Sequence, residues 1–316
     1  MIYILIFIII FFLYILITND IVVVSRYFIS SKKIPKDFDN YKILQISDFH
    51  SNYRLINKTV KKIKREKPNI IVITGDLIDR YESFDNIKKF LNMIKDIAPI
   101  YYVSGNHEIY YKRFIKLKKI LAKLNVKVLE NKSVSLKLKN NINLIGINDI
   151  SYNKKNIIKV IKSLIKENEY NILLSHRPEI FEKYVESKVD LVFTGHAHGG
   201  QFRIPLIGGV YAPGQGIFPK YTSGVYEKNE TKMIVNRALG DSGIVIRINN
   251  MRDIVLVTLK SEKWLKITLK IKRDCFWSLF LYSLHYCFLP KVMYILYIFG
   301  ATILENSPIY SIALAL

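Results

Sequence analysis

Histidine, aspartate and asparagine side chains gather in five short motifs, each directly after an apolar run typical of a buried β-strand. Four motifs hold five of the six histidines of the chain, and the remaining motif ends its strand with a carboxylate. The motifs are Asp48-Phe49-His50, Gly75-Asp76-Leu77-Ile78-Asp79, Gly105-Asn106-His107-Glu108, Ser175-His176-Arg177 and Gly195-His196-Ala197-His198-Gly199-Gly200-Gln201. Imidazole, carboxylate and amide groups bind divalent metal ions. Because strand ends of an α/β sheet meet at one edge, we expect one shared metal site.

A dinuclear hydrolytic centre holds two divalent ions about 3.5–4 Å apart, so that they bind the attacking and leaving oxygens. Asp48 and His50 are two residues apart at a strand end, so both can point toward one ion. Asp76 follows a glycine and can approach closely enough to bridge the two ions. His198, from the last motif, can also bind the first ion.

The second ion can be bound by Asn106, His176 and His196. His107 then lies beside a ligand without being one. A histidine in that place can protonate a leaving oxygen or stabilise charge on a phosphoryl group. We therefore expect His107 to be catalytic.

Each motif taken singly has a simpler explanation. An Asp or His at a strand end is often a cap, and Gly-Asp and Gly-Asn are common turn dipeptides. The pair His196 and His198 alone would also suit a mononuclear zinc site. Five motifs in one order, each at a strand end, favour a shared metal centre instead.

Apolar strands alternate with basic amphipathic helices along the chain, which predicts an α/β layered domain with its sheets covered by helices. Strands are expected over residues 41–47, 69–74, 100–104, 126–129, 133–138, 142–147, 171–174, 191–194, 210–211, 224–227, 232–236, 244–248 and 254–260. Helices are expected over residues 55–67, 84–95, 113–124, 154–167 and 178–183.

The chain of 316 residues has a formal net charge of +22. Its lysines are scattered over helical segments, such as residues 58–67 and 112–123, without interleaved aromatic residues. We therefore expect no nucleic-acid partner; an anionic membrane surface or a phosphate-bearing substrate explains the charge equally well. The only two cysteines, Cys275 and Cys287, offer no disulfide framework or thiolate zinc site.

Residues 1–17 contain no charged side chain. The length of this segment is near the lower limit for a membrane-spanning helix. The segment lacks the basic start and the Ala-x-Ala site of a cleaved signal peptide, so it predicts an uncleaved single-pass anchor in the cell membrane. The basic residues that follow it favour a cytoplasmic main domain under the positive-inside rule; they are Arg26, Lys32, Lys33 and Lys36.

Four parts are expected along the chain. They are the membrane anchor over residues 1–24, a linker over residues 25–40, the catalytic domain over residues 41–262 and an apolar extension over residues 263–316. The extension could be a membrane-associated hairpin, an interfacial helix pair or a segment without a role, and these alternatives stay open.

The motif set resembles the signature of the calcineurin-like metallophosphoesterases over roughly residues 41–260. The resemblance implies a four-layer α/β/β/α sandwich and a dinuclear site for Mn, Fe, Zn or similar ions. It implies the same roles as above, with Asp76 as the bridging ligand and His107 as the catalytic histidine.

Further features resemble membrane-anchored bacterial phosphoesterases, some of them related to the enzyme that hydrolyses UDP-diacylglucosamine. These features are the anchor, residues 195–201, residues 211–216 and residues 247–250. The chain departs from that subgroup at Met251-Arg252, where a Pro-Pro pair is expected, and in its extension. Gly199-Gly200-Gln201 either lets the backbone pass close to the metals, since glycine has no side chain in the way, or forms an ordinary tight turn. Residues 211–218 could form a loop over the substrate.

The function expected is hydrolysis of phosphoric esters or anhydrides, in which a metal-bound hydroxide attacks phosphorus. A lipid-linked or nucleotide-linked phosphate near the membrane is the expected substrate, and a monoesterase, a phosphodiesterase and a pyrophosphatase all fit. Two alternatives are a metal-dependent nuclease and a non-catalytic membrane-anchored binding protein.

Overall fold

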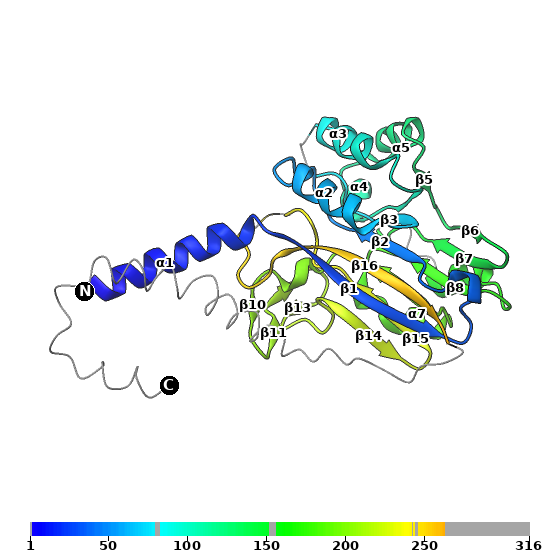
Figure 1. The fold of residues 1–316 in the computed structure, drawn as a ribbon. Helices are drawn as coiled ribbons and strands as arrows, with labels where there is room; N and C mark the ends of the chain where they lie inside the picture. The colour runs from blue at the N-terminus through cyan, green and yellow to red at the C-terminus, as the bar shows by residue number, and fades with distance from the viewer. Residues whose placement is uncertain (1, 80–82, 152–155, 242, 244–245, 263–316) are drawn as a thin grey trace. The chain divides into compact units, whose positions relative to one another are not determined.

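Two six-stranded sheets form the centre of the fold (Figure 1). The computed structural model describes residues 2–79, 83–151, 156–241, 243 and 246–262. The extension over residues 263–316, with both cysteines and His285, lies outside the described residues.

The first sheet is mixed: four of the five pairings between neighbouring strands are parallel and one is antiparallel. Its strands lie in the order β1 (Val22–Ser31), β16 (Arg252–Ser261), β2 (Lys42–Ile46), β3 (Ile70–Thr74), β4 (Ile100–Val103) and β5 (Lys127–Val128). The second sheet has the order β14 (Gly224–Lys228), β15 (Thr231–Val235), β9 (Leu191–Thr194), β8 (Tyr170–Leu174), β7 (Asn141–Gly146) and β6 (Lys132–Lys137).

Three apolar clusters separate four layers. Successive residues of one strand point to opposite faces, so Ile43 of β2 packs between the two sheets while Leu44 packs beneath the outer helices. The helices over the first sheet are α2 (Ile56–Glu66), α3 (Asp85–Ile94) and α5 (Phe114–Lys123). Those over the second sheet are α6 (Ile157–Leu164) and α7 (Phe181–Glu186). The expected α/β/β/α layering is confirmed.

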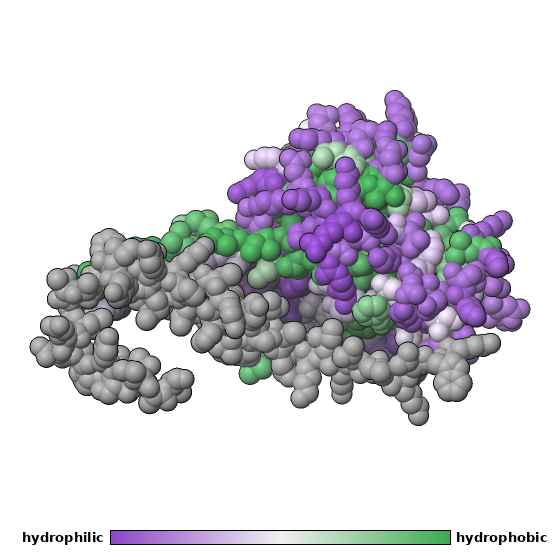
Figure 2. All heavy atoms as spheres, in the orientation of Figure 1, coloured by the Kyte–Doolittle hydropathy of each residue, from purple (hydrophilic) through white to green (hydrophobic). Residues whose placement is uncertain are grey.

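Helix α2 shows how the sequence builds an outer layer. Ile56, Val60 and Ile63 recur at helical spacing and are buried against the first sheet, while Lys58 and Lys61 point to solvent. Hydrophilic side chains accordingly cover the outer face of α2, α3 and α5 (Figure 2). The lysines of these helices lie on solvent-facing positions, as expected for a basic surface.

Strand β1 corrects the expected linker over residues 25–40. It pairs in parallel with β16 from Val22 to Ser31, and Val22 and Ile29 are buried. The strand lies at the edge of its sheet and its middle is only half-buried, so its sequence lacks the continuous apolar run of a central strand. The part of the expected linker that follows β1 contains a 3-10 turn, η1, at Lys36–Phe38.

The expected strand over residues 244–248 is also corrected. Its described residues, 246–248, contribute only an isolated bridge between Ile248 and Phe202. The backbone N–H and carbonyl of Arg247 both bond the Asn19 side chain, so they do not pair with a strand, and the buried Arg247 side chain bonds Asp241 and the carbonyl of Arg237. Two small hairpins lie nearby, β10 (Arg203–Ile204) with β11 (Gly208–Gly209) and β12 (Tyr211–Ala212) with β13 (Gly216–Ile217).

One described helix, α1 (Ile2–Asn19), is long and apolar enough to cross a membrane by length and composition. Its side chains are almost all exposed. Its last residue is hydrogen-bonded to the domain, since Asn19 Nδ2 donates to the Arg247 carbonyl at 2.7 Å and its Oδ1 accepts from the Arg247 N–H at 2.8 Å. The helix therefore joins the domain at a defined point.

Candidate metal centre

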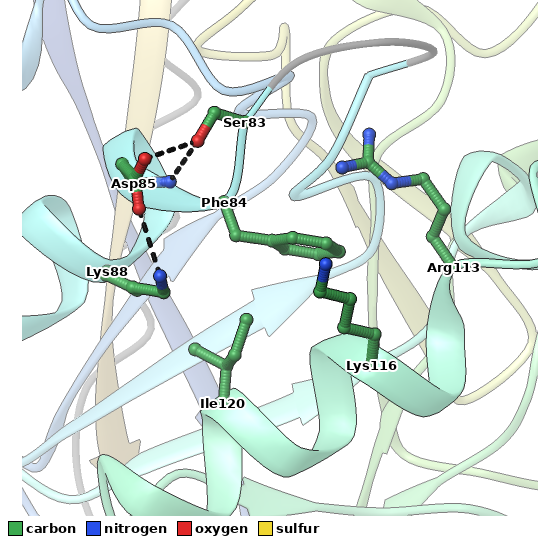
Figure 3. A pocket seen from close by; sticks show the side chains of 7 residues that line it. All are labelled: Ser83, Phe84, Asp85, Lys88, Arg113, Lys116 and Ile120. Carbon is green, nitrogen blue, oxygen red and sulfur yellow. Dashed lines mark hydrogen bonds and ion pairs between the residues drawn. The ribbon is translucent and has the colours of Figure 1, made fainter.

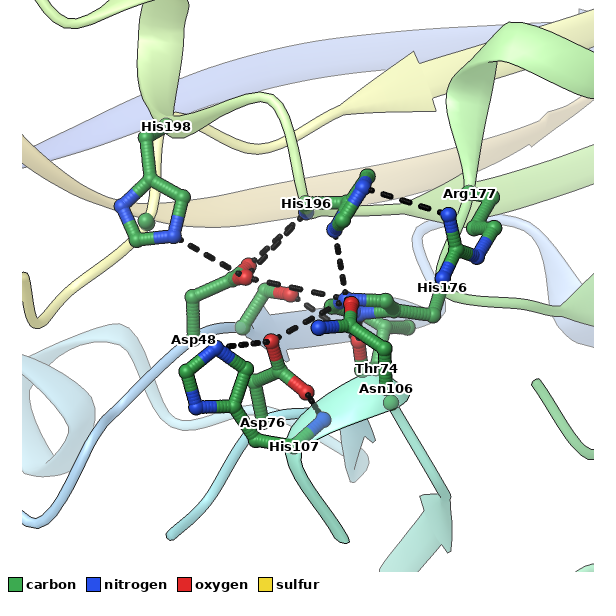
Figure 4. A network of polar contacts seen from close by, with 12 residues as sticks. Asp48, Thr74, Asp76, Asn106, His107, His176, Arg177, His196 and His198 are labelled. Carbon is green, nitrogen blue, oxygen red and sulfur yellow. Dashed lines mark hydrogen bonds and ion pairs between the residues drawn. The ribbon is translucent and has the colours of Figure 1, made fainter. Parts of the chain in front are cut away.

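The predicted site residues follow the carboxyl ends of central strands from both sheets. Asp48 follows β2, Asp76 follows β3, and Asn106 begins the short helix α4 (Asn106–Tyr110) after β4. His176 follows β8 and His196 follows β9. All eight predicted residues meet at one place. Figure 4 labels seven of them, and the eighth, His50, lies next to His198.

A first group consists of Asp48, His50 and His198, which are all buried. The Nε2 atoms of His50 and His198 lie 3.3 Å apart. The Asp48 Oδ1 atom lies 3.4 Å from His198 Nε2 and 3.9 Å from His50 Nε2. Three ligand atoms of the types that bind divalent metals therefore surround one point.

A second group consists of Asp76, Asn106, His176 and His196. His176 Nε2 lies 3.0 Å from Asn106 Oδ1, 3.1 Å from His196 Nδ1 and 3.3 Å from Asp76 Oδ2. His176 Nδ1 donates to the Thr74 carbonyl at 2.8 Å, which fixes the ring so that Nε2 faces the group.

Asp76 connects the two groups. Its Oδ2 atom lies 3.3 Å from His176 Nε2 in the second group and 3.9 Å from His50 Nε2 in the first. Its Oδ1 atom accepts the backbone N–H of His107 at 2.9 Å, which holds the carboxylate in place. Asp48 lies almost as centrally, with its Oδ1 3.9 Å from His176 Nε2. A carboxylate shared by two cations is thus available.

The protonation of these side chains fits a pair of cations. Burial lowers the pKa of His50 to about 4 and that of His196 to about 3, so both rings keep free lone pairs at neutral pH. Burial alone would raise the pKa of Asp76, but His176 and its neighbouring histidines outweigh that effect and hold the pKa well below its usual value. Buried carboxylates and neutral imidazoles that face one another are what two divalent ions require.

His107 lies beside these groups and is paired with Asp79. Its Nδ1 atom is 3.3 Å from Asp79 Oδ1, and its Nε2 atom is 3.8 Å from Asp76 Oδ2. Burial would lower the pKa of His107, but Asp79 and Asp76 outweigh it and raise the pKa above its ordinary value. The ring can therefore hold a proton near neutral pH. Asp79 had no role in the sequence prediction, although it stands three residues after Asp76 in the same motif.

Glu108 organises the loop that presents Asp76. Its buried carboxylate accepts backbone N–H groups from Gly105 at 2.7 Å, Asp76 at 3.0 Å, Leu77 at 2.8 Å and Ile78 at 3.2 Å. Burial raises the pKa of Glu108 to about 7, and the Asp76 charge adds to the effect. This residue thus ties the end of β3 to the start of α4.

The backbone is unusual at most of the candidate ligands. Asp48, His50, Asp76, His196 and His198 all have positive φ values, between 45° and 61°. A non-glycine residue in this left-handed region costs of order 1–3 kcal/mol and is concentrated at functional sites. These left-handed backbone conformations direct the candidate ligands toward one another, and the surrounding contacts must offset their conformational free energy.

Glycines allow the loops to approach one another. A Cβ atom on Gly75 would lie 2.6 Å from the Cα of Gly105, so only glycine fits where the Asp76 and Asn106 loops touch. A Cβ atom on Gly199 would meet Asn250 Oδ1, and one on Gly200 would meet the Cα of Gly209, so both glycines serve the packing of the His198 loop. Their expected closeness to the metals stays a prediction.

Arg177 forms a charged cluster beside His196 that the sequence did not predict. Its Nε donates to Asp149 Oδ2 at 2.7 Å, and its Nη1 donates to Glu179 Oε1 at 3.1 Å. The same Nη1 lies 3.5 Å from His196 Nε2. Asp149 is 28 residues from Arg177 along the chain, so no local pattern signals the pair.

A pocket of about 270 Å³ opens onto the two groups. Its lining residues are Asp76, Asn106, His107, His196, His198, Gln201, Tyr211, Pro213 and Gly243. The segment over residues 211–218, expected as a loop over the substrate, thus contributes Tyr211 and Pro213 to the wall.

A second hollow, of about 400 Å³, lies between α3 and α5 (Figure 3). Asp85 pairs there with Ser83 and Lys88, and the Arg113 guanidinium lies 4.3 Å from the Phe84 ring centre. None of the residues that line it belongs to the two ligand groups, so it is not the candidate centre.

Known proteins share this sequence pattern. The family profile of the calcineurin-like phosphoesterases matches residues 41–200. The uncharacterized metallophosphoesterase YkuE of Bacillus subtilis is 30% identical over 246 residues, which cover 75% of this chain and 85% of YkuE. A metallophosphoesterase of Aquifex aeolicus is 30% identical, with 76% and 92% covered, and the phosphodiesterase YaeI of Escherichia coli is 25% identical, with 69% and 82% covered.

The family expected from the motifs is confirmed by these matches, and the layered fold agrees with it. Members use two divalent metal ions, which suits the two ligand groups of this chain. The chain therefore belongs to the calcineurin-like phosphoesterases, a family of metal-dependent phosphoester hydrolases.

Proposed function

We propose that this chain hydrolyses a lipid-linked or nucleotide-linked phosphate at a membrane, where α1 anchors it. Asp48, His50 and His198 would hold a first ion, Asn106, His176 and His196 would hold a second, and the Asp76 carboxylate would be shared by both. The single observation that supports this assignment best is the position of Asp76 Oδ2 between His50 and His176.

The chemistry follows from the residues around that carboxylate. Two divalent ions, when bound, polarise the phosphoryl oxygens and make water nucleophilic near neutral pH. His107 lines the pocket, and Asp79 pairs with its Nδ1 atom and raises its pKa, which favours the donation of a proton from the ring to the leaving oxygen. The Arg177 guanidinium lies beside His196, and its hydrogen bond to Asp149 fixes its position there.

The location rests on α1 and on charge. The apolar helix supports a membrane anchor, and the net charge of +22 favours anionic lipids and phosphate groups. The basic residues after the helix favour a cytoplasmic domain. A diester is the first substrate to test, because the relative YaeI is named a phosphodiesterase.

The test uses the full chain in detergent with Mn²⁺ and compares monoester, diester and pyrophosphate substrates and DNA. Asp76→Asn should bind less metal and lose turnover. His107→Asn should keep its metal and still lose turnover by roughly 10²–10⁴-fold, the usual contribution of a general acid. Metal content is measured by mass spectrometry on the same samples.

His285→Asn is the matched control, because His285 lies outside every motif. It should behave as the unaltered chain does. Absence of metal-dependent turnover on every substrate would remove the enzymatic proposal, and turnover of DNA alone would replace it with a nuclease.

A further inference from the structure

Exposed apolar side chains gather on the two short hairpins next to the pocket. Leu206 and Ile207 lie at the tip of β10–β11, and Ile217 and Phe218 lie at the end of β12–β13. Leu206 is 77% exposed and Phe218 is 60% exposed. We call these four residues the hairpin patch.

The two hairpins form one surface. The Val210 N–H donates to the Phe202 carbonyl at 2.8 Å, and the Phe218 N–H donates to the Val210 carbonyl at 2.8 Å. Tyr211 of β12 is half exposed and also lines the pocket over the metal-ligand groups. The hairpin patch therefore adjoins the mouth of the site.

Hydrogen bonds connect the same hairpins to α1. The Arg203 N–H donates to the Ile248 carbonyl at 2.9 Å, and Asn249 Nδ2 donates to the Arg203 carbonyl at 3.2 Å. The Asn249 Oδ1 atom accepts the hydroxyl of Tyr14, a residue of α1. Two hydrogen bonds, both made by Asn249, thus connect the β10–β11 hairpin to α1.

The length of α1 then sets the depth of the patch. A helix of 18 residues is about 27 Å long, while a bilayer has a hydrocarbon core of about 30 Å. If α1 spans the bilayer, all of its length is needed to cross the hydrocarbon core, so Asn19 lies at the boundary with the headgroups. Tyr14 precedes it by about 7.5 Å along the helix axis. A hairpin bonded through Asn249 to Tyr14 then lies at or just inside the boundary between the headgroups and the hydrocarbon core.

Charge at the end of α1 agrees with that position. Lys58 of α2 forms an ion pair with Asp20, one residue past α1, so its charge is balanced there. Lys61 and Lys64 are exposed farther along the same helix. Basic side chains beside an apolar surface are the combination that binds an anionic membrane surface.

We propose that the hairpin patch inserts into the lipid headgroup layer beside α1, so that the pocket opens toward phosphates carried by membrane lipids. The inference rests on the proposed membrane anchor and names the source of the substrate, a phosphate ester or anhydride attached to a lipid. The occupant of the patch is the lipid surface itself.

The test places a polarity-sensitive fluorophore on single cysteines of the full chain, with Cys275 and Cys287 changed to serine. Labels replace Leu206, Phe218, Phe7 of α1 and Ile115. Ile115 of α5 is a matched control, because it is an apolar residue 70% exposed outside the patch. The protein is inserted into phosphatidylethanolamine and phosphatidylglycerol vesicles, with and without spin-labelled lipid.

We expect the spin-labelled lipid to quench the labels at 206 and 218 and the label at 7, and to leave the label at 115 unchanged. Quenching at 7 without quenching at 206 and 218 overturns the inference while the anchor stands. Blue-shifted but unquenched labels at 206 and 218 mean that protein, such as residues 263–316, covers the patch, which also overturns it. Absence of quenching at 7 overturns the membrane anchor itself.

Discussion

Asp79 controls the proton on His107. One ring nitrogen of His107 faces the Asp79 carboxylate at 3.3 Å, so the other nitrogen is directed toward the ligand groups. The carboxylate also raises the pKa of the ring after burial has lowered it. Asp79 is therefore a positioning residue that acts on the substrate through His107.

Asp79→Asn should lower kcat by about 10- to 100-fold, less than removal of the acid itself, which is worth about 10²–10⁴-fold. Because Asp79 raises the pKa of His107, the variant ring loses its proton at a lower pH. The alkaline limb of the kcat profile should therefore move to lower pH. Initial rates over a pH series with a soluble diester measure both effects.

Asp85→Asn is the control for this change, since Asp85 is an exposed acid on α3. It should leave kcat and its pH profile unaltered. Asp79 also lies near His50 and His107 in a third group that could hold a cation. Loss of bound metal in Asp79→Asn would make Asp79 a ligand and contradict the positioning role.

Residues of the centre differed in how far the sequence revealed them. The eight predicted residues stand in short motifs at strand ends, so their convergence followed from the strand order alone; their individual roles stay predictions. Asp149 and Arg177 pair across 28 residues, and Asn250 bonds the His198 loop from 52 residues away. Such contacts depend on how loops pack, which no local pattern encodes.

The segment that contains Asn250 supports the short turn η3 (His198–Gly200), which carries a candidate ligand. Asn250 Nδ2 donates to the His198 carbonyl at 2.7 Å and to the Gln201 carbonyl at 3.1 Å. Both bonds are buried, and Gly199 is pressed against the same side chain. The position of His198 therefore depends on a residue outside its own loop.

Asn250→Ala should destabilise the protein by about 1–3 kcal/mol, because two buried carbonyls lose a donor. Metal affinity should fall by about 10- to 100-fold, as for the loss of other groups that orient a ligand. Urea unfolding and metal titration measure the two effects. Asn92→Ala, which removes an exposed asparagine of α3, should change neither. Unchanged metal affinity in Asn250→Ala would show that the η3 turn holds His198 unaided.

Strand β1 offers a matched pair of substitutions on one element. Ile29 is 3% exposed and packs between the sheets, whereas its neighbour Phe28 is 66% exposed. Ile29→Ala should cost about 2–5 kcal/mol, the usual range for a buried isoleucine. Phe28→Ala should stay within about 0.5 kcal/mol, as surface changes do. Equal stabilities of the two variants in urea would mean that β1 does not belong to the folded sheet.

Elements were predictable where they are long and periodic. Helices α2, α3 and α5 lie within a residue or two of their expected ends, because each has a continuous apolar stripe. Strand β1 and the β10–β11 hairpin were missed. An edge strand shows a weak pattern, and paired segments of two residues are too short to have any period.

At the scale of the whole molecule, the centre joins the two sheets. Asp48, Asp76 and Asn106 come from loops of the first sheet, whereas His176 and His196 come from the second. Ions held between them would bind both halves of the sandwich at once. Metal binding should therefore stabilise the folded domain as a unit, in addition to enabling turnover.

The last prediction concerns that stabilisation and its dependence on pH. Without metal, burial would lower the pKa of His176, but Asp76 and Asp48 outweigh it and raise the pKa well above its usual value. Burial raises the pKa of Glu108 to about 7. In the folded, metal-free protein these two groups keep protons that they lose in the unfolded chain, so the stability that they contribute falls as pH rises. Metal ions displace those protons and remove the loss.

Mn²⁺ at about 100 times its Kd should add about 2.7 kcal/mol to the stability of the full chain in detergent, relative to a chelator. Because metal ions and protons compete, this increment should grow from about pH 5 to about pH 8. Thermal unfolding at several pH values, with Mn²⁺ or with EDTA, measures it. Asp76→Asn is the control, since it removes the carboxylate shared by both groups and should show little increment at any pH. An increment in the unaltered chain that shrinks as pH rises would contradict the ligand roles of His176 and Asp76, because metal binding would then not displace protons from the centre.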